Sequence, residues 1–478
     1  MTSRLTRSWP VLTAVLIAGA AALVYMRALG TPANYDEGVY LASLDAMRRG
    51  QELGTELYTS QPPVFYWLLR ALAAPFGSSI LDIRVAFALL AIAGVAAAIA
   101  LGWLLYGPPA GVAGGALVAI GPPYPSVAPT VSADVPAVAL GLLSLALVAF
   151  ALRSAALRPW AAAAGAVLAL AVLTKLLAIP FVVPFLALAL AARAARRVLP
   201  AALIGAALAT LIVAAAHAAA LEDIWSQVVT DHTRARNLGT LSGNVDQISK
   251  LLEPRTPFGW LVPLGFLAFV LSRRARRTWP LWTFVPAAAG FLVLVHPLAD
   301  HHLVLLSVAC AISAGPSIAL AIGGLPRTPQ AVAITVLALF VAAGIYQEQR
   351  RLHRNDIPEA PEVTWAIEAI ERTTGRNALV ITDQPIVLFL AKRATAGPLV
   401  DISSTRVTGG ALTAAEVNAV IRRSRPDAVL VDRMLRFLPV VIARLDRGYR
   451  WRVRCGSATL YLTRRAATPP CPAQLRRI

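Results

Sequence analysis

Two adjacent acidic residues, Asp36 and Glu37, follow directly after the first long apolar stretch of the chain. They lie in TPANYDEGVYLASLDAMRRG, which spans residues 31–50. A carboxylate at such a place can accept the proton of a hydroxyl group that attacks a substrate. Because successive helix residues point about 100° apart, the two carboxylates need not share this task. The alternative is that both acids only stabilise the N-terminal end of the helix that this sequence predicts.

Three further polar features interrupt apolar sequence where we expect helix ends. Asp134 in SADVP begins a predicted helix, where it is either a functional acid or an ordinary first-turn acid. Lys175 lies in LTKLLAIP, and an ionisable residue among apolar residues usually faces a partner or a polar cavity. His301 and His302 in ADHHLVLL can donate to an anion, bind a metal, or lie at a membrane interface without either role.

The composition indicates a protein with many membrane-spanning segments. Of the 478 residues, 57% are hydrophobic and only 14% are charged, which is outside the range of ordinary soluble proteins. The net charge of +19 rests on arginine, because the only lysines are Lys175, Lys250 and Lys392. Most of the arginines form short clusters between apolar runs, as residues that fix membrane topology do. We therefore predict no nucleic-acid partner.

The three cysteines offer no metal-binding pattern, since none stands at zinc-finger or cluster spacing from histidine or another cysteine. Cys310 lies in an apolar run, where we expect it to pack. Cys455 and Cys471 lie in the polar C-terminal part and can pair if that part faces an oxidising compartment.

About eleven apolar stretches approach the length of about 20 residues that a spanning helix needs. They cover residues 10–27, 83–106, 110–124, 135–152, 160–173, 176–192, 199–221, 258–271, 279–295, 303–322 and 330–346. Arg4 and Arg7 before the first stretch are also typical of a cleaved signal peptide. We favour a retained helix, because its length is close to that of a span and further spans follow.

Clusters of arginine at alternate connections predict the orientation of these spans. The clusters are Arg153 with Arg158, Arg193 with Arg196 and Arg197, Arg273 with Arg274, Arg276 and Arg277, and the single Arg327. Their side, which includes the N-terminus, should be cytoplasmic. Residues 28–82, the turn GPPYPSVAPTVSADVP, the loop 222–257, HPLADHH and the C-terminal tail then lie outside a plasma membrane.

Two stretches of the first outer segment, residues 37–49 and 62–77, predict amphipathic helices on the membrane surface. Such helices would roof a cavity at the edge of the bilayer. The tail differs from the rest, because short apolar strands alternate with helical segments from residue 355 onwards. This pattern predicts a transmembrane domain over residues 1–350 and an extracytoplasmic α/β domain over 355–478 with a largely parallel sheet. The tail carries no glycine-rich nucleotide-binding motif.

The order of these features resembles the GT-C superfamily of membrane glycosyltransferases, in particular the branch of protein O-mannosyltransferases and bacterial aminoarabinose transferases. The matching features are an apolar first helix, YDEGVYL, G…LY…PPVFYW, SADVP, LTK, HHLVLL and an α/β tail. The resemblance implies a polytopic α-helical fold. It also implies transfer of a sugar, usually with inversion, from a polyprenyl-phosphate donor to a lipid, glycan or protein acceptor at the outer face.

The resemblance places the family's acidic position on Asp36, with Glu37 beside it, and its proline pair on Pro62 and Pro63. The residues that we expect to line the substrate cavity are Tyr40, Tyr58, Pro62, Pro63, Tyr66 and Asp134. Some aminoarabinose transferases carry an acidic and a basic residue directly before the proline pair. Ser60 and Gln61 stand there in this chain, so the resemblance alone does not assign it the metal site or the substrate of that branch.

The expected chemistry needs one base and a group that stabilises negative charge. Asp36 is the candidate base for the acceptor hydroxyl, and the phosphate leaving group is so weakly basic that no paired acid is required. The developing phosphate charge needs cations or oriented donors. The candidates, in order, are Lys175, then Arg234 or Arg236, then His301 and His302. A divalent ion is an open alternative for this role, and no cofactor is certain.

Two other functions remain as alternatives. A transporter or flippase of lipid-linked intermediates would use the same carboxylates for coupling or gating, but the chain has no pair of similar hydropathy halves. A catalytically inactive GT-C-like protein would bind lipid or a partner only.

Overall fold

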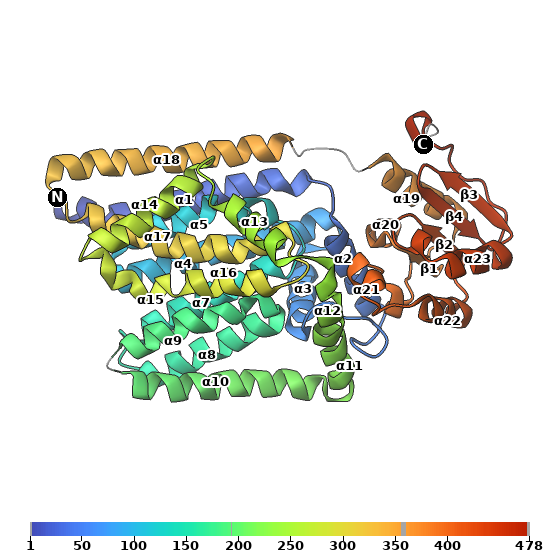
Figure 1. Ribbon diagram of the computed structural model, residues 1–478, viewed down its shortest axis with the longest axis horizontal. Coiled ribbons are helices and arrows are strands. Elements are labelled where there is room, and N and C mark those ends of the chain that lie inside the picture. Colours follow the sequence, from blue (N-terminus) through green and yellow to red (C-terminus); the bar gives the residue numbers. More distant parts are fainter. Residues whose placement is uncertain (1, 193, 355–359, 476–478) are drawn as a thin grey trace. The chain divides into compact units, whose positions relative to one another are not determined.

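The computed structural model describes residues 2–192, 194–354 and 360–475 (Figure 1). Within these residues the chain forms two compact units. The first unit comprises Met1–Gly30, Ala71–Ala216 and Thr240–Asp356. The second comprises Thr31–Arg70, His217–Gly239 and Ile357–Ile478. Two segments that lie between apolar helices in the sequence therefore pack with the C-terminal tail.

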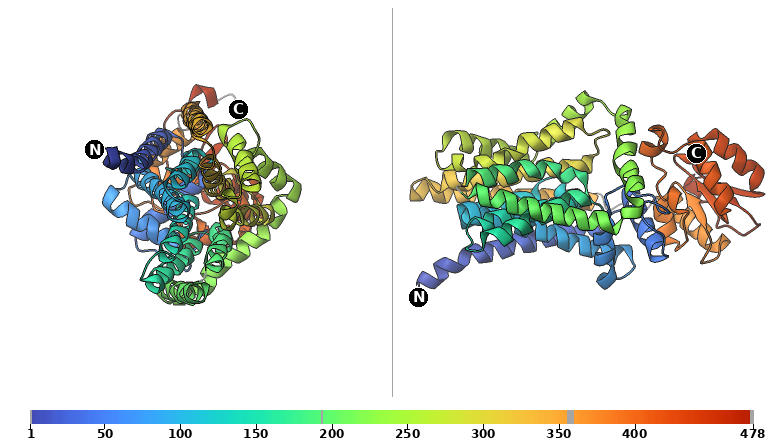
Figure 2. Two further views of the ribbon diagram at one scale, coloured as in Figure 1. Left: turned by 90° about the vertical axis from the view of Figure 1, so that its left-hand side faces the viewer. Right: turned by 90° about the horizontal axis from the view of Figure 1, so that it is seen from below.

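The first unit is a bundle of long apolar helices that lie alongside one another, as the end-on view of Figure 2 shows. Its main helices are α1 (Thr2–Arg27), α4 (Ile80–Tyr106), α5 (Pro108–Ile120), α7 (Asp134–Ala151), α8 (Leu157–Thr174), α9 (Val182–Ala191), α10 (Ala195–Ala216), α13 (Leu241–Leu251), α14 (Pro257–Leu271), α16 (Phe284–Leu294), α17 (Val304–Ile322) and α18 (Arg327–Arg354).

All the predicted apolar stretches are helical, but they differ in length. Seven helices of the described chain are long and apolar enough to cross a membrane. An eighth span results if Pro257–Leu271 and Ala275–Leu294, which are bent by 114°, count as one. α5 and the helical stretch Leu176–Ala191 are shorter. The multi-pass character is thus supported, whereas the count of eleven spans stays a prediction.

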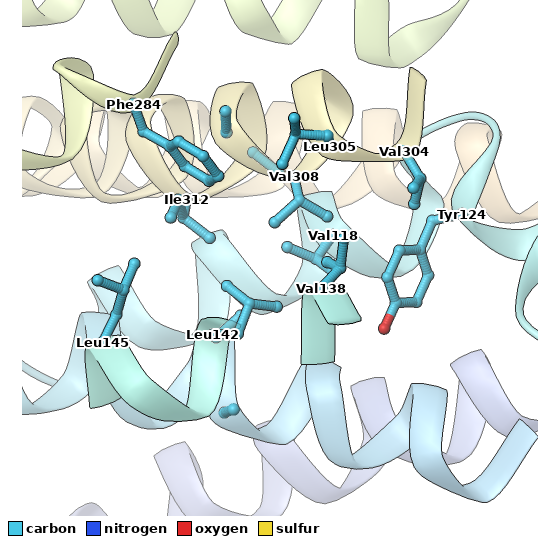
Figure 3. Close-up of a cluster of buried hydrophobic side chains, with 14 of the residues drawn as sticks. Val118, Tyr124, Val138, Leu142, Leu145, Phe284, Val304, Leu305, Val308 and Ile312 are labelled. Atoms are coloured by element: carbon cyan, nitrogen blue, oxygen red, sulfur yellow. The ribbon is translucent and has the colours of Figure 1, made fainter. Parts of the chain in front are cut away.

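Small residues and apolar side chains hold the bundle together. α8 and α10 approach closely, since a Cβ added at Gly165 would lie 1.9 Å from the carbonyl oxygen of Ala202. Small residues at helix contacts permit such packing within membranes. Figure 3 shows part of the buried core, where side chains of α5, α7, α16 and α17 meet. They include Val118, Val138, Leu142, Leu145, Phe284, Val308 and Ile312.

The C-terminal part of the second unit contains a four-stranded sheet in the order β1 (Val380–Thr382), β2 (Ala428–Val431), β4 (Ala458–Leu462) and β3 (Trp451–Cys455). Only β1 and β2 are parallel, whereas β4 is antiparallel to both β2 and β3. The prediction of a largely parallel sheet was therefore wrong. Gly456, with a φ of 58°, permits a tight turn between β3 and β4, and a tight turn can join only antiparallel strands.

Helices α19 (Pro361–Thr373), α20 (Pro385–Leu390), α21 (Ser404–Thr408), α22 (Ala414–Ser424) and α23 (Pro439–Gly448) accompany the sheet. Side chains of α22 and α23 form one hydrophobic core with Ile381, Val429 and Tyr461 of the sheet. Cys455 and Cys471 form a disulfide, as their position in the tail suggested. Cys310 is buried in α17, as expected for a packing residue.

The segment over residues 28–82, which we predict to lie outside the membrane, forms α2 (Tyr35–Arg48) and α3 (Pro63–Phe76). α2 packs against α20, and a Cβ added at Gly38 would lie 2.6 Å from the backbone nitrogen of Ile386. Its apolar residues Val39, Leu41 and Leu44 are buried in the protein. The apolar face of α2 is therefore covered by other parts of the chain, and its location on the membrane surface stays a prediction.

Candidate active site

A buried ion pair between Asp134 and Lys175 forms the centre of a polar cluster in the first unit. Nζ of Lys175 lies 2.8 Å from both carboxylate oxygens of Asp134. Asp134 is 1% exposed and Lys175 is 8% exposed. Charges at such depth require a partner, and each of these two residues provides it for the other.

Helix ends bring these two residues together. Asp134 lies in the first turn of α7, and Lys175 follows the last residue of α8 with an extended backbone. Antiparallel neighbouring helices place the start of one beside the end of the other. The ionic partners are thus at one end of the bundle, and their chain separation of 41 residues is bridged by this pairing of helices.

His301 and His302 complete the cluster from a short 3₁₀ turn, Asp300–Leu303, that leads into α17. Nε2 of His301 lies 3.9 Å from Oδ2 of Asp134, and the two imidazole rings meet edge to face with centroids 4.4 Å apart. The turn is held from α13, because Gln247 donates a hydrogen bond of 2.6 Å to Asp300. Both histidines are partly exposed, unlike the ion pair.

The arrangement suits the recognition of an anion. An ammonium group carries three N–H donors, and two of them reach Asp134. The carboxylate thus holds the ammonium of Lys175 in place inside the protein, and the partly exposed imidazoles provide further donors beside it. A phosphate group is the kind of ligand that such a cluster would stabilise.

The cluster also has the donor set of a metal site. One ligand atom each from Asp134, His301 and His302 lie within 4.8 Å of one another. Carboxylate and imidazole are ligands that zinc uses in catalytic sites. The ammonium of Lys175, however, contacts both oxygens of Asp134, so it competes with a metal for this ligand. The set thus fits a divalent cation chemically, but the carboxylate already has a cationic partner.

The predicted base lies in the second unit, in the first turn of α2. Asn34 caps this helix, and its side chain accepts a hydrogen bond of 2.8 Å from the backbone N–H of Glu37. Glu37 is fully buried, whereas Asp36 is partly exposed. Asn34 is thus the N-cap, and both acids lie in the first turn, so the alternative that they stabilise this helix end stays open. The difference in burial agrees with the expectation that the two carboxylates need not share one task.

Several predicted cavity residues meet around the start of α3. The hydroxyl of Tyr40 accepts a hydrogen bond of 3.0 Å from Nε2 of Gln61. The hydroxyl of Tyr66 accepts one of 3.2 Å from the backbone N–H of Ser60. The proline pair marks the beginning of the helix, since Pro63 is its first residue. Pro62 lies next to it and accepts the backbone N–H of Phe65.

Tyr58 belongs to a second polar group, which the sequence did not reveal. Its hydroxyl donates to Asp231 over 3.3 Å, and the guanidinium carbon of Arg406 lies 3.5 Å from the centre of its ring. Burial raises the pKa of Tyr58 well above its ordinary value, although the Arg406 cation opposes this shift, so the phenol stays a donor. Burial also raises the pKa of Asp231. No local motif identifies Arg406, because its partners are far away in the chain.

The predicted phosphate ligands do not all belong to one unit. Lys175, His301 and His302 form the cluster of the first unit with Asp134. Arg234 belongs to the second unit, where it is half exposed and lies 3.5 Å from Asp231. The side chain of Arg236, like those of Arg4 and Arg7, lies outside the described part of the structure.

Comparison with known proteins agrees with this architecture. Residues 60–219 match the model of a family described as dolichyl-phosphate-mannose-protein mannosyltransferase. The fold is similar to that of ArnT from Cupriavidus metallidurans bound to undecaprenyl phosphate, with a TM-score of 0.70 and 15% identity over 95% of this chain and 99% of that one. The chain has the GT-C fold.

Another GT-C structure with a similar fold is that of the archaeal oligosaccharyltransferase AglB from Archaeoglobus fulgidus in complex with an inhibitory peptide and a dolichol-phosphate. The TM-score is 0.53, and 12% of residues are identical over 89% of this chain and 70% of that one. A further structure of the Archaeoglobus fulgidus enzyme is a complex with zinc and sulfate, with a TM-score of 0.51 and 13% identity over 87% and 68% of the two chains. No sequence among the curated proteins matches this chain significantly. The resemblance inferred from the sequence is thereby confirmed at the level of the fold.

Proposed function

We propose that this chain is an inverting glycosyltransferase that uses a polyprenyl-phosphate sugar at the outer face of a plasma membrane. The acceptor is a lipid, a glycan or a protein. The observation that carries the proposal is the likeness, over nearly the whole of both chains, to a structure that holds undecaprenyl phosphate. The dolichol-phosphate in the archaeal neighbour supports the same class of donor.

The proposed reaction is a single displacement at the anomeric carbon of the sugar. The acceptor oxygen forms a bond to C1 while the bond from C1 to the donor phosphate oxygen breaks. The acceptor proton passes to the carboxylate of Asp36, and the bonding electrons leave with the polyprenyl phosphate. One carboxylate suffices, because the phosphate is a weak base and leaves without prior protonation.

In this proposal the cluster of the first unit binds the donor phosphate. Lys175 supplies the positive charge, Asp134 orients its ammonium group, and His301 and His302 donate hydrogen bonds. Donors that are already in place cost little reorganisation when charge develops on the leaving oxygen, and one such donor is commonly worth about 3 kcal/mol of transition-state stabilisation. No step needs a metal ion, since the ammonium supplies the cation. Arg234 remains a second candidate for phosphate binding.

Release of free polyprenyl phosphate by the purified protein in lipid tests the proposal. A panel of polyprenyl-phosphate sugars is offered together with cell-envelope acceptors. We expect release with one donor by the wild type, and loss of about two to four orders of magnitude in rate with Asp36→Asn. The matched control is Asp45→Asn, because Asp45 lies on the same helix and pairs with the neighbouring Arg49 at 3.5 Å.

The outcome distinguishes the alternatives. Near-normal release by Asp36→Asn would defeat the assignment of the base. Absence of release with every donor, together with uptake of the labelled donor into sealed vesicles, would favour the transporter or flippase. Binding of the donor without release or transport would indicate the inactive GT-C-like protein.

A further inference from the structure

The tail contains a hollow that the proposed reaction does not use. It has a volume of about 770 Å³ and lies where α22 and α23 end beside the sheet. Binding sites for small molecules commonly have volumes of about 300 to 1,000 Å³. Arg422, Arg425, Arg444 and Arg447 all line it. A concave surface with this concentration of one charge indicates a bound counter-charge.

The charges of these arginines are not compensated within the described part of the chain. None of the four guanidinium groups forms an ion pair with a carboxylate there, and only Arg447 donates a side-chain hydrogen bond, to the carbonyl oxygen of Ala443. The acid nearest in sequence, Asp427, has its Oδ2 engaged by the backbone N–H of Leu379. Four like charges on one hollow repel one another unless an anion lies between them.

Arg425 occupies a backbone conformation that favours glycine. It caps α22 with φ 47° and ψ 60°, in the left-handed region. Glycine is the usual residue at such a helix end, because a Cβ is unfavourable there. The arginine thus carries a conformational cost at a position that places its side chain on the wall of the hollow. An unfavourable backbone conformation of this kind indicates a function for the side chain.

The other residues that line the hollow indicate a second feature of the ligand, in addition to its negative charge. Tyr449 lies on the wall of the hollow, and its hydroxyl is engaged with the carbonyl oxygen of Pro426 at 3.0 Å. Tyr449 therefore offers its aromatic ring, rather than its hydroxyl group, to a ligand in the hollow. The hydroxyl of Thr463, on the same wall, donates to the carbonyl oxygen of Asp427 at 3.2 Å, so towards a ligand it can act only as an acceptor. An aromatic ring beside hydrogen-bonding groups suits a saccharide, and guanidinium groups match phosphate in shape and charge. A planar lipid surface would not fill a concave hollow.

We propose that this hollow is a binding site for a saccharide that carries at least two phosphate groups. The site lies wholly within the tail, and its ligand is recognised by the four arginines with Tyr449. The inference is independent of the proposed transferase activity, because it is tested by equilibrium binding alone. The plain alternative is that Arg422 and Arg447 only offset the negative C-terminal ends of α22 and α23. That alternative explains neither the conformation of Arg425 nor its convergence with Arg444.

Calorimetric titration of the full-length protein in detergent tests the site with fructose 1,6-bisphosphate as the probe. Fructose 6-phosphate, inorganic phosphate, neutral fructose and a short-chain phosphatidylglycerol are the comparison ligands. We expect the bisphosphate to bind at least about tenfold more tightly than the monophosphate, and neutral fructose not to bind. Equal affinity for inorganic phosphate and the bisphosphate would refute the assignment of a saccharide ligand. Tighter binding of phosphatidylglycerol than of the bisphosphate would also refute it and would indicate a lipid headgroup as the ligand.

The decisive variant is Arg425→Gly, which separates binding from folding. Glycine relieves the left-handed conformation, so the melting temperature should be unchanged or higher. The affinity for the bisphosphate should nevertheless fall by about fivefold or more. Arg444→Gln should have the same effect on affinity. Arg454→Gln, on exposed β3 outside the hollow, is the control and should leave affinity unchanged. Unchanged affinity in Arg425→Gly, or an equal loss in Arg454→Gln, would refute the site.

Discussion

The structure makes its sharpest prediction for the ion pair of Lys175 and Asp134, where loss of the ammonium group should lower the stability of the fold. Lys175→Met keeps the length of the side chain but leaves the carboxylate of Asp134, which is 1% exposed, without its main partner. At 2.8 Å the attraction between the two charges is about 6 kcal/mol at an effective dielectric constant of about 20. In the intact pair, the desolvation free energy of the two groups offsets much of this attraction. In the variant, the carboxylate of Asp134 is still desolvated but has lost the attraction of the ammonium.

We therefore expect Lys175→Met to lower the free energy of unfolding by about 3 to 5 kcal/mol. His301, at 3.9 Å from Asp134, provides some compensation, so the lower part of this range is expected. Asp134→Asn should also destabilise the protein, because it leaves the ammonium buried beside a neutral amide. The double variant has no buried charge and should be more stable than the sum of the two single effects predicts, by about 2 to 3 kcal/mol.

Equilibrium unfolding in mixed micelles, followed by tryptophan fluorescence, measures this double-mutant cycle. The matched control is Lys250→Met, which breaks an exposed ion pair with Asp246 at 2.6 Å and should change stability little. Additive effects of the two substitutions, with a coupling energy below about 0.5 kcal/mol, would show that the pair is not the buried unit described here. A loss in Lys250→Met as large as that in Lys175→Met would lead to the same conclusion.

Three further outcomes follow from the structure. Lys175→Met removes the competitor for the carboxylate, so it should bind Zn²⁺ more tightly than the wild type in calorimetry, and equal affinity would show that the ammonium does not compete. Replacement of Cys455 and Cys471 by alanine opens a disulfide with a sequence separation of 16, which should lower the unfolding free energy by about 3 kcal/mol, and no change in chemical denaturation would contradict this. Burial raises the pKa of Asp231, so the folded state holds this proton to higher pH than the unfolded chain does. The contribution of Asp231 to the free energy of unfolding should therefore decrease as the pH rises above about 3.9. The pH slope of stability should be more positive in Asp231→Asn than in the wild type, and identical slopes would refute this.

The hydropathy of the sequence predicts where the apolar helices lie along the chain, but it does not predict what surrounds each helix in the fold. The apolar stretches are helical because lipid requires every backbone polar group to be satisfied within the segment. The sequence of an amphipathic helix does not show whether its apolar face contacts lipid or protein. Val39, Leu41 and Leu44 of α2 form the same apolar pattern in either surroundings, and here they are buried in the protein.

The candidate site shows the same limit. The rarity of charge within apolar sequence was sufficient to select Lys175, Asp134 and the two histidines, because such groups are costly in a membrane unless they have partners. Their mutual pairing depends on which helix ends meet, and no local pattern encodes that. Arg406 shows the opposite case, because it lies in a polar tail where arginine is common, and only the fold brings it to Tyr58.

The packing of α2 against the tail has a consequence for biogenesis. Tyr35 at the start of α2 donates a hydrogen bond of 3.1 Å to Asp401, which follows it by 366 residues. The ribosome completes these tail residues only after every apolar helix has been made. Helix α2, which carries Asp36, therefore cannot pack against the tail until the last part of the chain has been synthesised. A chain that stops short of the tail would hold Asp36 and Glu37 in an incomplete second unit, so synthesis of the apolar helices and completion of the second unit are separate events.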